Sequence, residues 1–361
     1  MNLERLLEIW KLSREGADHY RTSPVAMFLR FRRLSKKFRV NPEEACRVGI
    51  IDPKLDDEWI FDRFISKYFL VKIQTQYNPK SHFGLTEDKA IFYALCQGHS
   101  LPHPKVLAII GSLGSWTGEG TLIRERRQWE DFFENRLPDR FLIKPAGGFH
   151  GEGIRIVKKL DGVCVDNEGA RRTAGELFAY LIAGPPKARW VLQEVLSNHP
   201  EIARLTGSNA ISTARMLTKV ETGGECRFFH AVFRVIVGSN VVDNVRHGQT
   251  GNLVCELDLE KGTLLQGKIT TSKWGCRNVD VHPETGVQFR GFQLPDWEKA
   301  RDLVIAAAPK FLPARMLGWD IAFTPEGPSI VETNACWDPM SSLDYSRRVI
   351  EVLREDYRKL I

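Results

Sequence analysis

The sequence predicts an α+β fold, in which a helical N-terminal region precedes a larger part that is rich in β-strands. Residues 1–84 carry apolar side chains at intervals of three and four, the spacing of amphipathic helices. From residue 141 onward, short apolar runs between turn residues indicate strands. Two strand-rich parts are therefore expected after the helical region, at residues 85–196 and 197–361.

Helices are expected in three places. The N-terminal region contains four periodic segments, and a further helix follows with Thr86 as its N-cap and an end near Cys96. Two more helices close the chain. Apart from the helix at 86–96, the expected segments are 3–20, 24–38, 42–48, 56–66, 296–311 and 342–360.

Strands are expected where apolar runs of four to ten residues are bounded by turn residues. The segment GSLGSWTGEG at 111–120 also follows such a run, but its glycines do not fit the GxGxxG pattern of dinucleotide-binding loops. It is therefore expected to be a surface loop. The expected strands are 106–110, 141–144, 154–157, 190–196, 211–220, 228–237 and 253–257.

Composition is that of an ordinary soluble protein. The 361 residues are 43% apolar and 27% charged, which suits two or three subdomains with a substantial core. No apolar run approaches the roughly 20 residues that cross a bilayer, and the first residues do not resemble a secretion signal. The seven cysteines are scattered without a CxxC pair, so neither a disulfide framework nor a zinc site is indicated. A cytoplasmic location is expected.

The positive charge is concentrated at the N-terminus. Residues 1–40 contain ten Lys or Arg and four Asp or Glu, an excess that equals the net charge of +6 for the whole chain. Such a basic arm could contact an acidic partner, a nucleic acid or anionic lipid. Packing on the body is favoured, because charge runs usually mark the exposed faces of packed helices. The side chains that would pack are Met27, Phe28, Phe31 and Leu34.

A candidate magnesium site lies near the C-terminus, in GWDIAFTPEGPSIVETN. If the chain reverses near Glu326, Asp320 lies opposite Glu332 in an antiparallel hairpin, with the two side chains about 5 Å apart. Asn334 then points to the same face, because side chains two residues apart share a face. Carboxylate and amide oxygens suit Mg²⁺, which leaves its other positions to water and phosphate. An exposed polar hairpin is the alternative.

A glycine-rich loop gives a second signal, in FLIKPAGGFHGEGIRIV at 141–157. A strand that ends at Lys144 leads into four glycines, and another strand begins at Ile154. Such a loop can fold over a polyphosphate and present backbone N–H groups, while Lys144 adds a positive charge. It is not a Walker loop, because GK[ST] and a following helix are absent. Taken alone, four glycines between two strands are more often a flexible hairpin.

The order of these motifs resembles the ATP-grasp superfamily over roughly residues 86–340. The sequence has a lysine on a helix (Lys89), the Lys144 strand with its glycine loop, the apolar segment 190–196, and Asp320 followed by Glu332-x-Asn334. The segments SNHPEIARL, AISTARMLT, VVDNVRHGQTGN, HPETG and LPDW resemble the sugar-transfer-associated branch, which is related to glutamate-ligase-like enzymes. The resemblance implies two α+β subdomains that enclose ATP.

The resemblance also implies roles for individual residues. Lys89 and Lys144 would contact the phosphates of ATP, the glycine loop would form a lid, and the backbone of 193–196 would contact adenine. One or two Mg²⁺ ions would be held by Asp320, Glu332 and Asn334. The ribose is expected near Glu201. The nucleotide-binding residues implied are Lys89, Lys144, Gly147, Gly148, Gly151, Gly153, Gln193, Glu194, Leu196 and Glu201.

The activity implied is that of an ATP-dependent carboxylate–amine ligase, which forms an amide or peptide bond through an acyl phosphate and releases ADP and phosphate. Small carboxylate and amine compounds would be the substrates. Arg215 and Lys144 are the expected catalytic residues. For Arg215 and Arg234 a structural pairing with a core carboxylate is an equal alternative, and of the two Arg215 is the better candidate for the γ-phosphate or acyl-phosphate oxygens. The expected substrate contacts are Arg234, Asp243, Arg246, His247 and Asn252.

Two other functions use the same nucleotide and metal residues. An ATP-grasp phosphotransferase would phosphorylate a small-molecule hydroxyl in place of a carboxylate. A non-catalytic nucleotide-binding partner of glycan or peptide assembly machinery is the third possibility. The sequence does not identify the acceptor, because acceptor pockets are built from variable loops.

Overall fold

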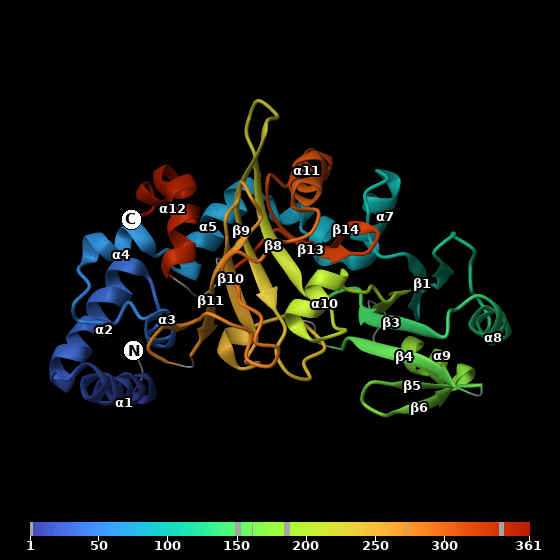
Figure 1. Ribbon diagram of the computed structural model, residues 1–361, viewed down its shortest axis with the longest axis horizontal. Coiled ribbons are helices and arrows are strands. Elements are labelled where there is room, and N and C mark those ends of the chain that lie inside the picture. Colours follow the sequence, from blue (N-terminus) through green and yellow to red (C-terminus); the bar gives the residue numbers. More distant parts are fainter. Residues whose placement is uncertain (1–2, 149–152, 161, 184–187, 272, 339–342) are drawn as a thin grey trace.

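A computed structural model describes residues 3–148, 153–160, 162–183, 188–271, 273–338 and 343–361. Its helices pack around two separate sheets, and the N-terminal helices form the left-hand part of the molecule in Figure 1. The fold class is therefore α+β with a helical N-terminal region, as the sequence predicts. None of the described helices combines the length and apolar character that a membrane span requires.

Five helices make up the N-terminal region. The first three match the expected bounds: α1 (Leu3–Tyr20), α2 (Pro24–Phe38) and α3 (Pro42–Val48). The fourth helix was expected over 56–66 but is shorter. The observed α4 (Asp57–Arg63) ends before Phe64, where the chain becomes extended. A helix that the sequence reading missed then follows, α5 (Lys67–Tyr77).

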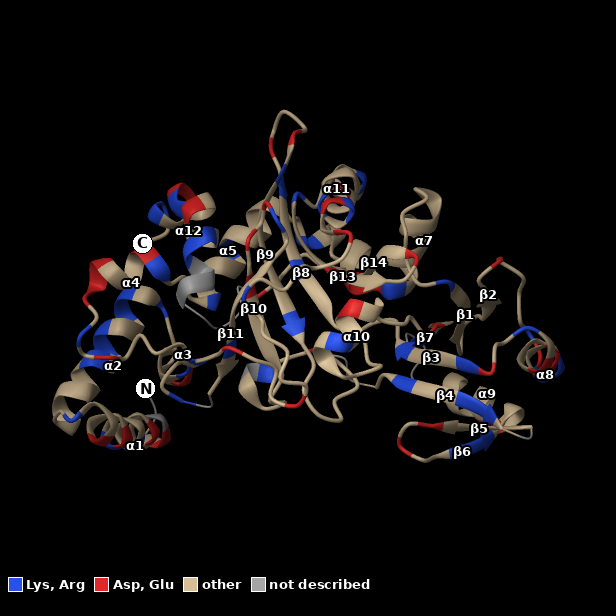
Figure 2. Ribbon diagram, viewed as in Figure 1, with Lys and Arg blue, Asp and Glu red and all other residues tan. Residues whose placement is uncertain are grey.

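The basic arm packs on the body through α2. Met27, Phe31 and Leu34 are at most 1% exposed. Arg30 is also buried, and its guanidinium donates hydrogen bonds to three backbone carbonyls of the segment 50–55. The other basic side chains of α2 stay on the outer surface, where Figure 2 shows blue segments. The packed arrangement that the sequence favours is therefore the observed one.

The helix expected to open at Thr86 begins three residues later. The N-cap of α7 (Lys89–Gly98) is Asp88, whose carboxylate accepts hydrogen bonds from the N–H groups of Ala90 and Ile91. Thr86 lies inside the short helix α6 (Gly84–Glu87), which follows η1 (Lys80–His82). The expected cap was wrong because a Thr and an Asp two residues apart are both good caps, and only the backbone turn at Asp88 selects between them.

The first sheet has seven antiparallel strands in the order β2-β1-β7-β3-β4-β5-β6. Side chains alternate along β3: Phe141 and Ile143 pack in a core with α8 (Arg126–Asn135) and α9 (Ala174–Ile182), whereas Leu142 and Lys144 point to the opposite face. The segment 111–120, expected to be a loop, contains the short strand β2. The strands are β1 (Val106–Gly111), β2 (Trp116–Thr117), β3 (Arg140–Pro145), β4 (Arg155–Leu160), β5 (Val163–Asp166), β6 (Arg171–Thr173) and β7 (Arg189–Glu194).

The second sheet also has seven antiparallel strands, in the order β12-β11-β10-β9-β8-β13-β14. Along β13, Trp319 and Ile321 enter the main core, so Asp320 between them faces the other way. The strands are β8 (Thr213–Val220), β9 (Cys226–Val235), β10 (Leu253–Leu257), β11 (Leu264–Thr270), β12 (Cys276–Val279), β13 (Met316–Thr324) and β14 (Gly327–Asn334).

Helices cover both faces of the second sheet. On one face, α7, α11 (Trp297–Ala307) and η3 (Ala308–Phe311) pack against β8 and β13 in the main core, with α10 (Pro200–Thr206) at its edge. On the other face, α5 and α12 (Leu343–Arg358) pack together over Leu217 and Met316. The side chain of Asn78, which directly follows α5, donates hydrogen bonds to the carbonyls of Met316 and Ala335. The N-terminal region is thus attached to the strand that carries Asp320.

Candidate active site

The acidic hairpin has the register that the sequence predicts. Asp320 of β13 is paired with Glu332 of β14, Gly318 is paired with Asn334, and the chain reverses between Thr324 and Gly327. The Asn334 amide lies 3.4 Å from Oε1 of Glu332, to which its Nδ2 donates. The three oxygen-bearing side chains therefore share one face of the sheet.

Two arginines on the neighbouring strands bind Asp320. Arg215 of β8 is the cross-strand partner of Asp320, and its Nε and Nη2 donate to both carboxylate oxygens. Arg234 of β9 donates to Oδ1 of the same carboxylate and, at 3.3 Å, to Oδ1 of Asp243. Asp243 in turn accepts hydrogen bonds from the backbone N–H and the hydroxyl of Thr213. Two arginines and two carboxylates are thus joined in one hydrogen-bonded network.

Asp320 and Arg234 hold each other in ionised form. Burial alone raises the pKa of the Asp320 carboxyl, but Arg215 and Arg234 outweigh burial and bring that pKa to about 2. For Arg234, burial lowers the pKa, whereas Asp320 and Asp243 raise it above its usual value. Burial also raises the pKa of Asp243, against the opposing effect of Arg234. Asp320 is 3% exposed and Arg234 is 6% exposed, so water screens this network little.

The two lysines expected at the phosphates lie close to the hairpin. Lys144 is buried, and its Nζ donates to the hydroxyl of Tyr93 at 2.7 Å. Burial lowers the pKa of Lys144 to about 7, with Glu332 raising it and Lys89 lowering it. Lys89 Nζ lies 3.9 Å from Oε2 of Glu332 and donates to the carbonyl of Gly148 at 3.1 Å. Gly148 itself has a φ of +123°, which favours glycine at this point of the loop.

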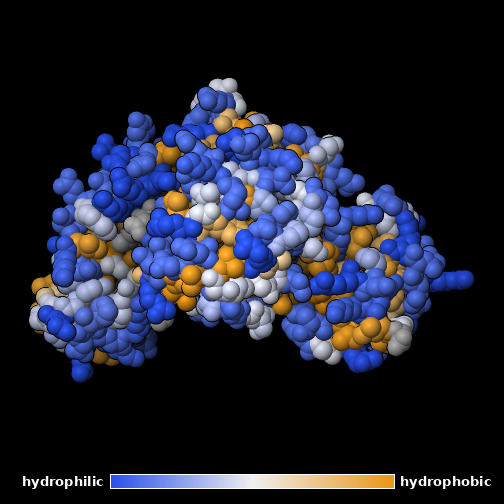
Figure 3. Space-filling view, viewed as in Figure 1, coloured by the Kyte–Doolittle hydropathy of each residue, from blue (hydrophilic) through white to orange (hydrophobic). Residues whose placement is uncertain are grey.

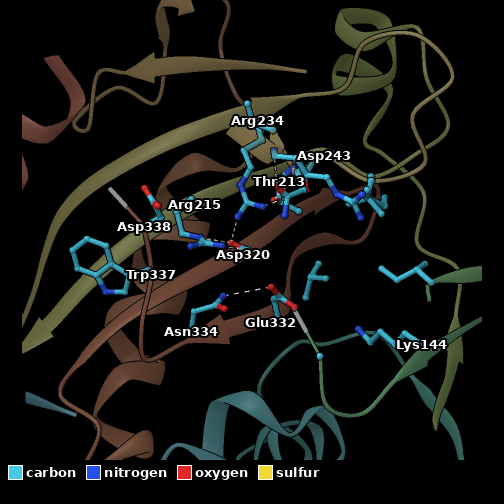
Figure 4. A pocket seen from close by; sticks show the side chains of 18 of the residues that line it. Lys144, Thr213, Arg215, Arg234, Asp243, Asp320, Glu332, Asn334, Trp337 and Asp338 are labelled. Carbon is cyan, nitrogen blue, oxygen red and sulfur yellow. Dashed lines mark hydrogen bonds and ion pairs between the residues drawn. The ribbon is translucent and has the colours of Figure 1, made fainter. Parts of the chain in front are cut away.

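One cavity of about 580 Å³ joins these groups. It is lined by Lys89, Lys144 and Gly148 from the first part of the chain and by Asp320, Glu332 and Asn334 from the hairpin. Figure 4 shows the hairpin residues between Lys144 on one side and Trp337 on the other. Figure 3 shows the surface indented where the lobe with β4–β6 meets the central body. Gly148, at the start of the glycine loop, and the acidic hairpin therefore face one cleft.

An apolar slot opens from this cavity beside the first sheet. Leu142 and Ile156 come from adjacent strands, and Leu196 comes from the segment that follows β7. Gln193 lies in the same wall, and its buried Oε1 has no hydrogen-bond partner within the described residues. A flat heterocycle with an amine donor would match such a slot.

Several expected site residues lie elsewhere. Glu201 is exposed on α10 and paired with Arg204, so it is not in the cavity wall. The Glu194 carboxylate accepts from the backbone N–H of Lys105 and is likewise outside the wall. Asn252 is fully buried, and its amide holds the loop 237–244 through four hydrogen bonds, a structural role that leaves no atom for a substrate.

The remaining expected residues fall into three groups. Arg234, Asp243 and Arg246 line the cavity. Gly147 and Gly153 flank the loop without lining the cavity, and Gly151 lies outside the described residues. His247 belongs to η2 (Arg246–Gly248), but its side chain is outside the described part of the structure.

Sequence reasoning missed other residues that line the cavity or lie behind its wall. The backbone N–H of Thr213 donates a hydrogen bond to Asp243. The hydroxyl of Tyr93 accepts a hydrogen bond from Lys144 and donates one to the carbonyl of Val331. Lys67 and Trp337 line the cavity. Gly318, two residues before Asp320, admits Trp337, because a Cβ at this position would lie 2.9 Å from the Cβ of Trp337. No spacing or motif marks these residues, since they converge only through the packing of elements that are distant along the chain.

The donor set of the hairpin fits a magnesium ion. Glu332 and the Oδ1 atom of Asn334 face the cavity region and, together with Asp320, provide hard oxygen donors of the type that Mg²⁺ prefers. Asp320 is the least available of the three to bind a metal ion, because both of its oxygens already accept hydrogen bonds from guanidinium groups. Within the described residues there is no cluster of three or more His, Cys, Asp or Glu side chains that could hold a metal. Any ion here would therefore depend on the amide of Asn334.

Two sheets that enclose such a cavity, with helices on their outer faces, form the ATP-grasp fold. Residues 69–352 match the model of the family described as sugar-transfer associated ATP-grasp, so the chain belongs to this family. The family resemblance indicated by the sequence motifs is thereby confirmed. No curated protein matches the sequence.

Solved structures with similarity to this chain have low sequence identity. An ADP complex of purK, N5-carboxyaminoimidazole ribonucleotide synthetase, has 11% identity and a TM-score of 0.36, over 69% of this chain and 45% of that chain. The D-cycloserine synthetase DcsG has 12% identity and a TM-score of 0.38, over 84% and 87% of the two chains. D-alanyl-alanine synthetase A from Vibrio cholerae O1 biovar eltor str. N16961 has 10% identity and a TM-score of 0.37, over 76% and 66%. The chain thus spans less than half the length of the first of these proteins.

Proposed function

We propose that this protein is an ATP-dependent carboxylate–amine ligase. The observation that carries the proposal is the single cavity in which an apolar slot, two lysines and an acid–acid–amide hairpin meet. ATP has a matching order of parts, with a flat base at one end and a triphosphate at the other. Adenine would occupy the slot at Leu142 and Ile156, and the phosphates would lie between Lys144 and Glu332.

The chemistry follows from the charges. A substrate carboxylate attacks the γ-phosphorus of ATP, a new P–O bond forms, and the bond to the ADP oxygen breaks. Both reactants are anions, so positive groups must reduce their repulsion. Lys89 and Lys144 supply such charge at the phosphates, and Arg215 and Arg234 supply it at the sheet surface. An amine then attacks the carbonyl carbon of the acyl phosphate, the C–N bond forms, the C–O bond to the phosphate breaks, and phosphate and a proton are released.

Magnesium would be held by Glu332 and Asn334 with Asp320. When bound, Mg²⁺ would supply Lewis-acid neutralisation of the phosphate oxygens. The protein's own contribution is to keep these oxygens on one face of a hairpin whose register is fixed by seven residue pairs along β13 and β14. Arg215 has a second contribution, because it orients Asp320 through two hydrogen bonds.

A ligase is favoured over a phosphotransferase by the extent of the cavity. The cavity lining includes Trp337 as well as Asp243 and Arg246, and Figure 4 shows Trp337 and Asp243 on different sides of Arg215. A kinase needs one acceptor region, whereas a ligase needs space for a carboxylate and an amine. Lining residues on both sides of Arg215 support two acceptors.

The test combines product analysis with a matched pair of variants. Purified protein is incubated with Mg-ATP and panels of carboxylates and amines, and products are identified by mass spectrometry. A ligase condenses two compounds and releases ADP, whereas a phosphotransferase adds phosphate to one. Glu332→Gln is expected to lower ADP formation about a hundredfold or more. Glu326→Gln, at the exposed turn of the same hairpin, is the control and should retain activity.

Two broader expectations also remain proposals. None of the seven cysteines is in a disulfide, which supports a cytoplasmic location because reduced thiols are typical of that compartment. The exposed basic side chains of α2 support contact with an acidic partner, although the apolar face of the helix is already buried. The identity of the carboxylate is left to the product analysis.

A further inference from the structure

Exposed apolar side chains gather on the first two helices. The inner faces of α1 and α2 are buried, yet five other large apolar side chains of these helices are 41–72% exposed. Within the described residues, nine further exposed apolar side chains are scattered over 68–361. Single exposed apolar side chains are ordinary, whereas a group of them marks an interaction surface. The five are Leu3, Leu7 and Trp10 of α1, and Val25 and Leu29 of α2.

The members on α1 form one line on the side that contacts α2. Leu3, Leu7 and Trp10 are separated by four and three residues, so they lie along one stripe of the helix. The Trp10 ring meets the Phe28 ring of α2 edge to face, with the ring centroids 6.0 Å apart. The acidic side chains of α1 form a different stripe, at positions 4, 8, 15 and 18. The apolar line therefore lies between the acidic stripe and α2.

The outer face of α2 combines apolar and basic side chains. Val25, Leu29, Arg32 and Lys36 follow one another at intervals of four, three and four, so they also share one stripe, and all four are exposed. The two other exposed basic side chains of α2 are paired with Asp57. The sequence of α2 contains no acidic residue. This face is therefore apolar at its start and positive toward its end.

The lines on the two helices meet at the contact between Trp10 and Phe28. Phe28 lies three residues after Val25 and four before Arg32, so it borders the line on α2. Arg14, which is exposed, follows Trp10 by one turn and adds a positive charge to the line on α1. Figure 3 shows apolar and hydrophilic atoms side by side at the left end of the molecule, where α1 and α2 lie in Figure 1.

We propose that this patch docks the protein on an anionic lipid surface. The exposed apolar side chains would enter the boundary between head groups and acyl chains, and Trp10 would lie at that boundary. Arg32 and Lys36 would meet the lipid phosphates. A soluble acidic partner would satisfy the basic side chains but leave Leu3 and Leu7 in water, because the line on α1 is mainly apolar. An anionic bilayer accommodates both kinds of side chain.

The position of the patch is compatible with an active enzyme. Figure 1 places α1 and α2 at one end of the molecule and β4–β6 at the other. The surface is indented where the lobe with β4–β6 meets the central body, away from the patch. A docked molecule would therefore keep its cavity open to small substrates. The inference does not depend on the proposed ligase function.

The test measures binding of the full-length protein to lipid vesicles by flotation. Vesicles that contain phosphatidylglycerol should bind the protein, and neutral phosphatidylcholine vesicles should bind it much more weakly. The double variant Leu7→Glu with Leu29→Glu should lose binding about tenfold or more, because it places negative charge in the apolar part of the patch. Arg32→Gln with Lys36→Gln should lose about tenfold or more as well, since each basic side chain adds to the attraction.

Matched controls carry the same changes at exposed sites elsewhere. Leu113→Glu with Leu122→Glu, and Lys261→Gln with Lys299→Gln, should bind vesicles like the wild type. Brominated lipid should quench the fluorescence of the bound wild type more than that of Trp10→Phe. ADP formation from Mg-ATP is measured in every variant and should not change, which keeps this test separate from that of the ligase.

Three results would overturn the proposal. The first is no binding to anionic vesicles. The second is binding that neither patch variant weakens. The third is loss of binding in the basic variant while the apolar variant binds normally, together with equal binding of soluble polyglutamate, which would identify a site for an acidic protein in place of a lipid surface.

Discussion

At the residue scale, Asp320 has two roles that compete for its oxygens. It is a proposed metal ligand, and it is also the partner of two arginines in the floor of the cavity. The sequence predicts its position opposite Glu332, because a short turn fixes the register of a hairpin. It does not predict the arginine partners, because Arg215 is 105 residues away along the chain. Only the pairing of β8 with β13 brings them together.

Asp320 and Glu332 should contribute differently to the free energy of unfolding. Asp320→Ala removes the main partner of the buried Arg234 and is expected to lower the free energy of unfolding by about 3 kcal/mol or more. Glu332→Ala should cost less than about 1 kcal/mol, because exposed groups contribute little, and the Glu332 side chain is 31% exposed. Urea unfolding of both variants measures this. Equal losses would contradict the buried network.

The pKa of Lys144 predicts a proton-linked step in nucleotide binding. Burial brings this pKa to about 7 in the free protein, so at pH 8 the amine is mostly neutral. A bound polyphosphate favours the charged form and raises the pKa, so binding should take up as much as about one proton per site. Nucleotide affinity should therefore fall as the pH rises above 7.

Calorimetry in two buffers with different ionisation enthalpies tests this uptake. Titration of Mg-ADP at pH 8 should give different apparent heats in the two buffers. Lys144→Arg is the control, because the guanidinium stays charged and should bind without proton uptake. Identical heats for the wild-type protein in both buffers would refute the assignment.

At the element scale, α5 explains how the N-terminal helices reach the site. Helix α5 was not predicted from the sequence, because the extended residues after α4 interrupt the apolar periodicity. The domain boundary that we propose near residue 84 separates helices from sheets along the chain, yet α5 lines the cavity. The connection runs through Asn78, whose side chain makes three hydrogen bonds to the backbone of Met316 and Ala335.

Asn78→Ala is expected to loosen this connection. The variant leaves three buried backbone groups without partners, so the free energy of unfolding should fall by about 3 kcal/mol. Asn135→Ala, which removes an exposed amide bonded to Asp131, should change it by less than about 0.5 kcal/mol. Denaturant unfolding of the two variants gives the comparison. A small effect at Asn78 would mean that α5 is held by its apolar contacts alone.

At the scale of the whole molecule, the two sheets form the walls of one cavity, so ligand binding should stabilise both. Mg-ATP is expected to raise the melting temperature by mass action. Removal of magnesium with a chelator should leave only weak stabilisation by ATP, because the phosphates would then face Glu332 without a neutralising ion. Thermal shift with and without chelator measures the difference. Unchanged stabilisation under chelation would argue against the metal site.

The sequence by itself determined the features that depend on neighbours along the chain. These are the first three helices, the hairpin register of Asp320 and Glu332, and the glycine loop after Lys144. Each follows from periodicity, capping or a short turn, which are local constraints on the backbone.

The tertiary structure alone decided which side chains share the cavity. Asn252 looked like a substrate contact but holds a loop, and Glu201 lies outside the cavity wall. Lys67, Glu87 and Trp337 carry no motif, yet they line the cavity. The physical reason is that the packing of helices against sheets depends on the summed burial of many distant apolar side chains, which no short segment encodes.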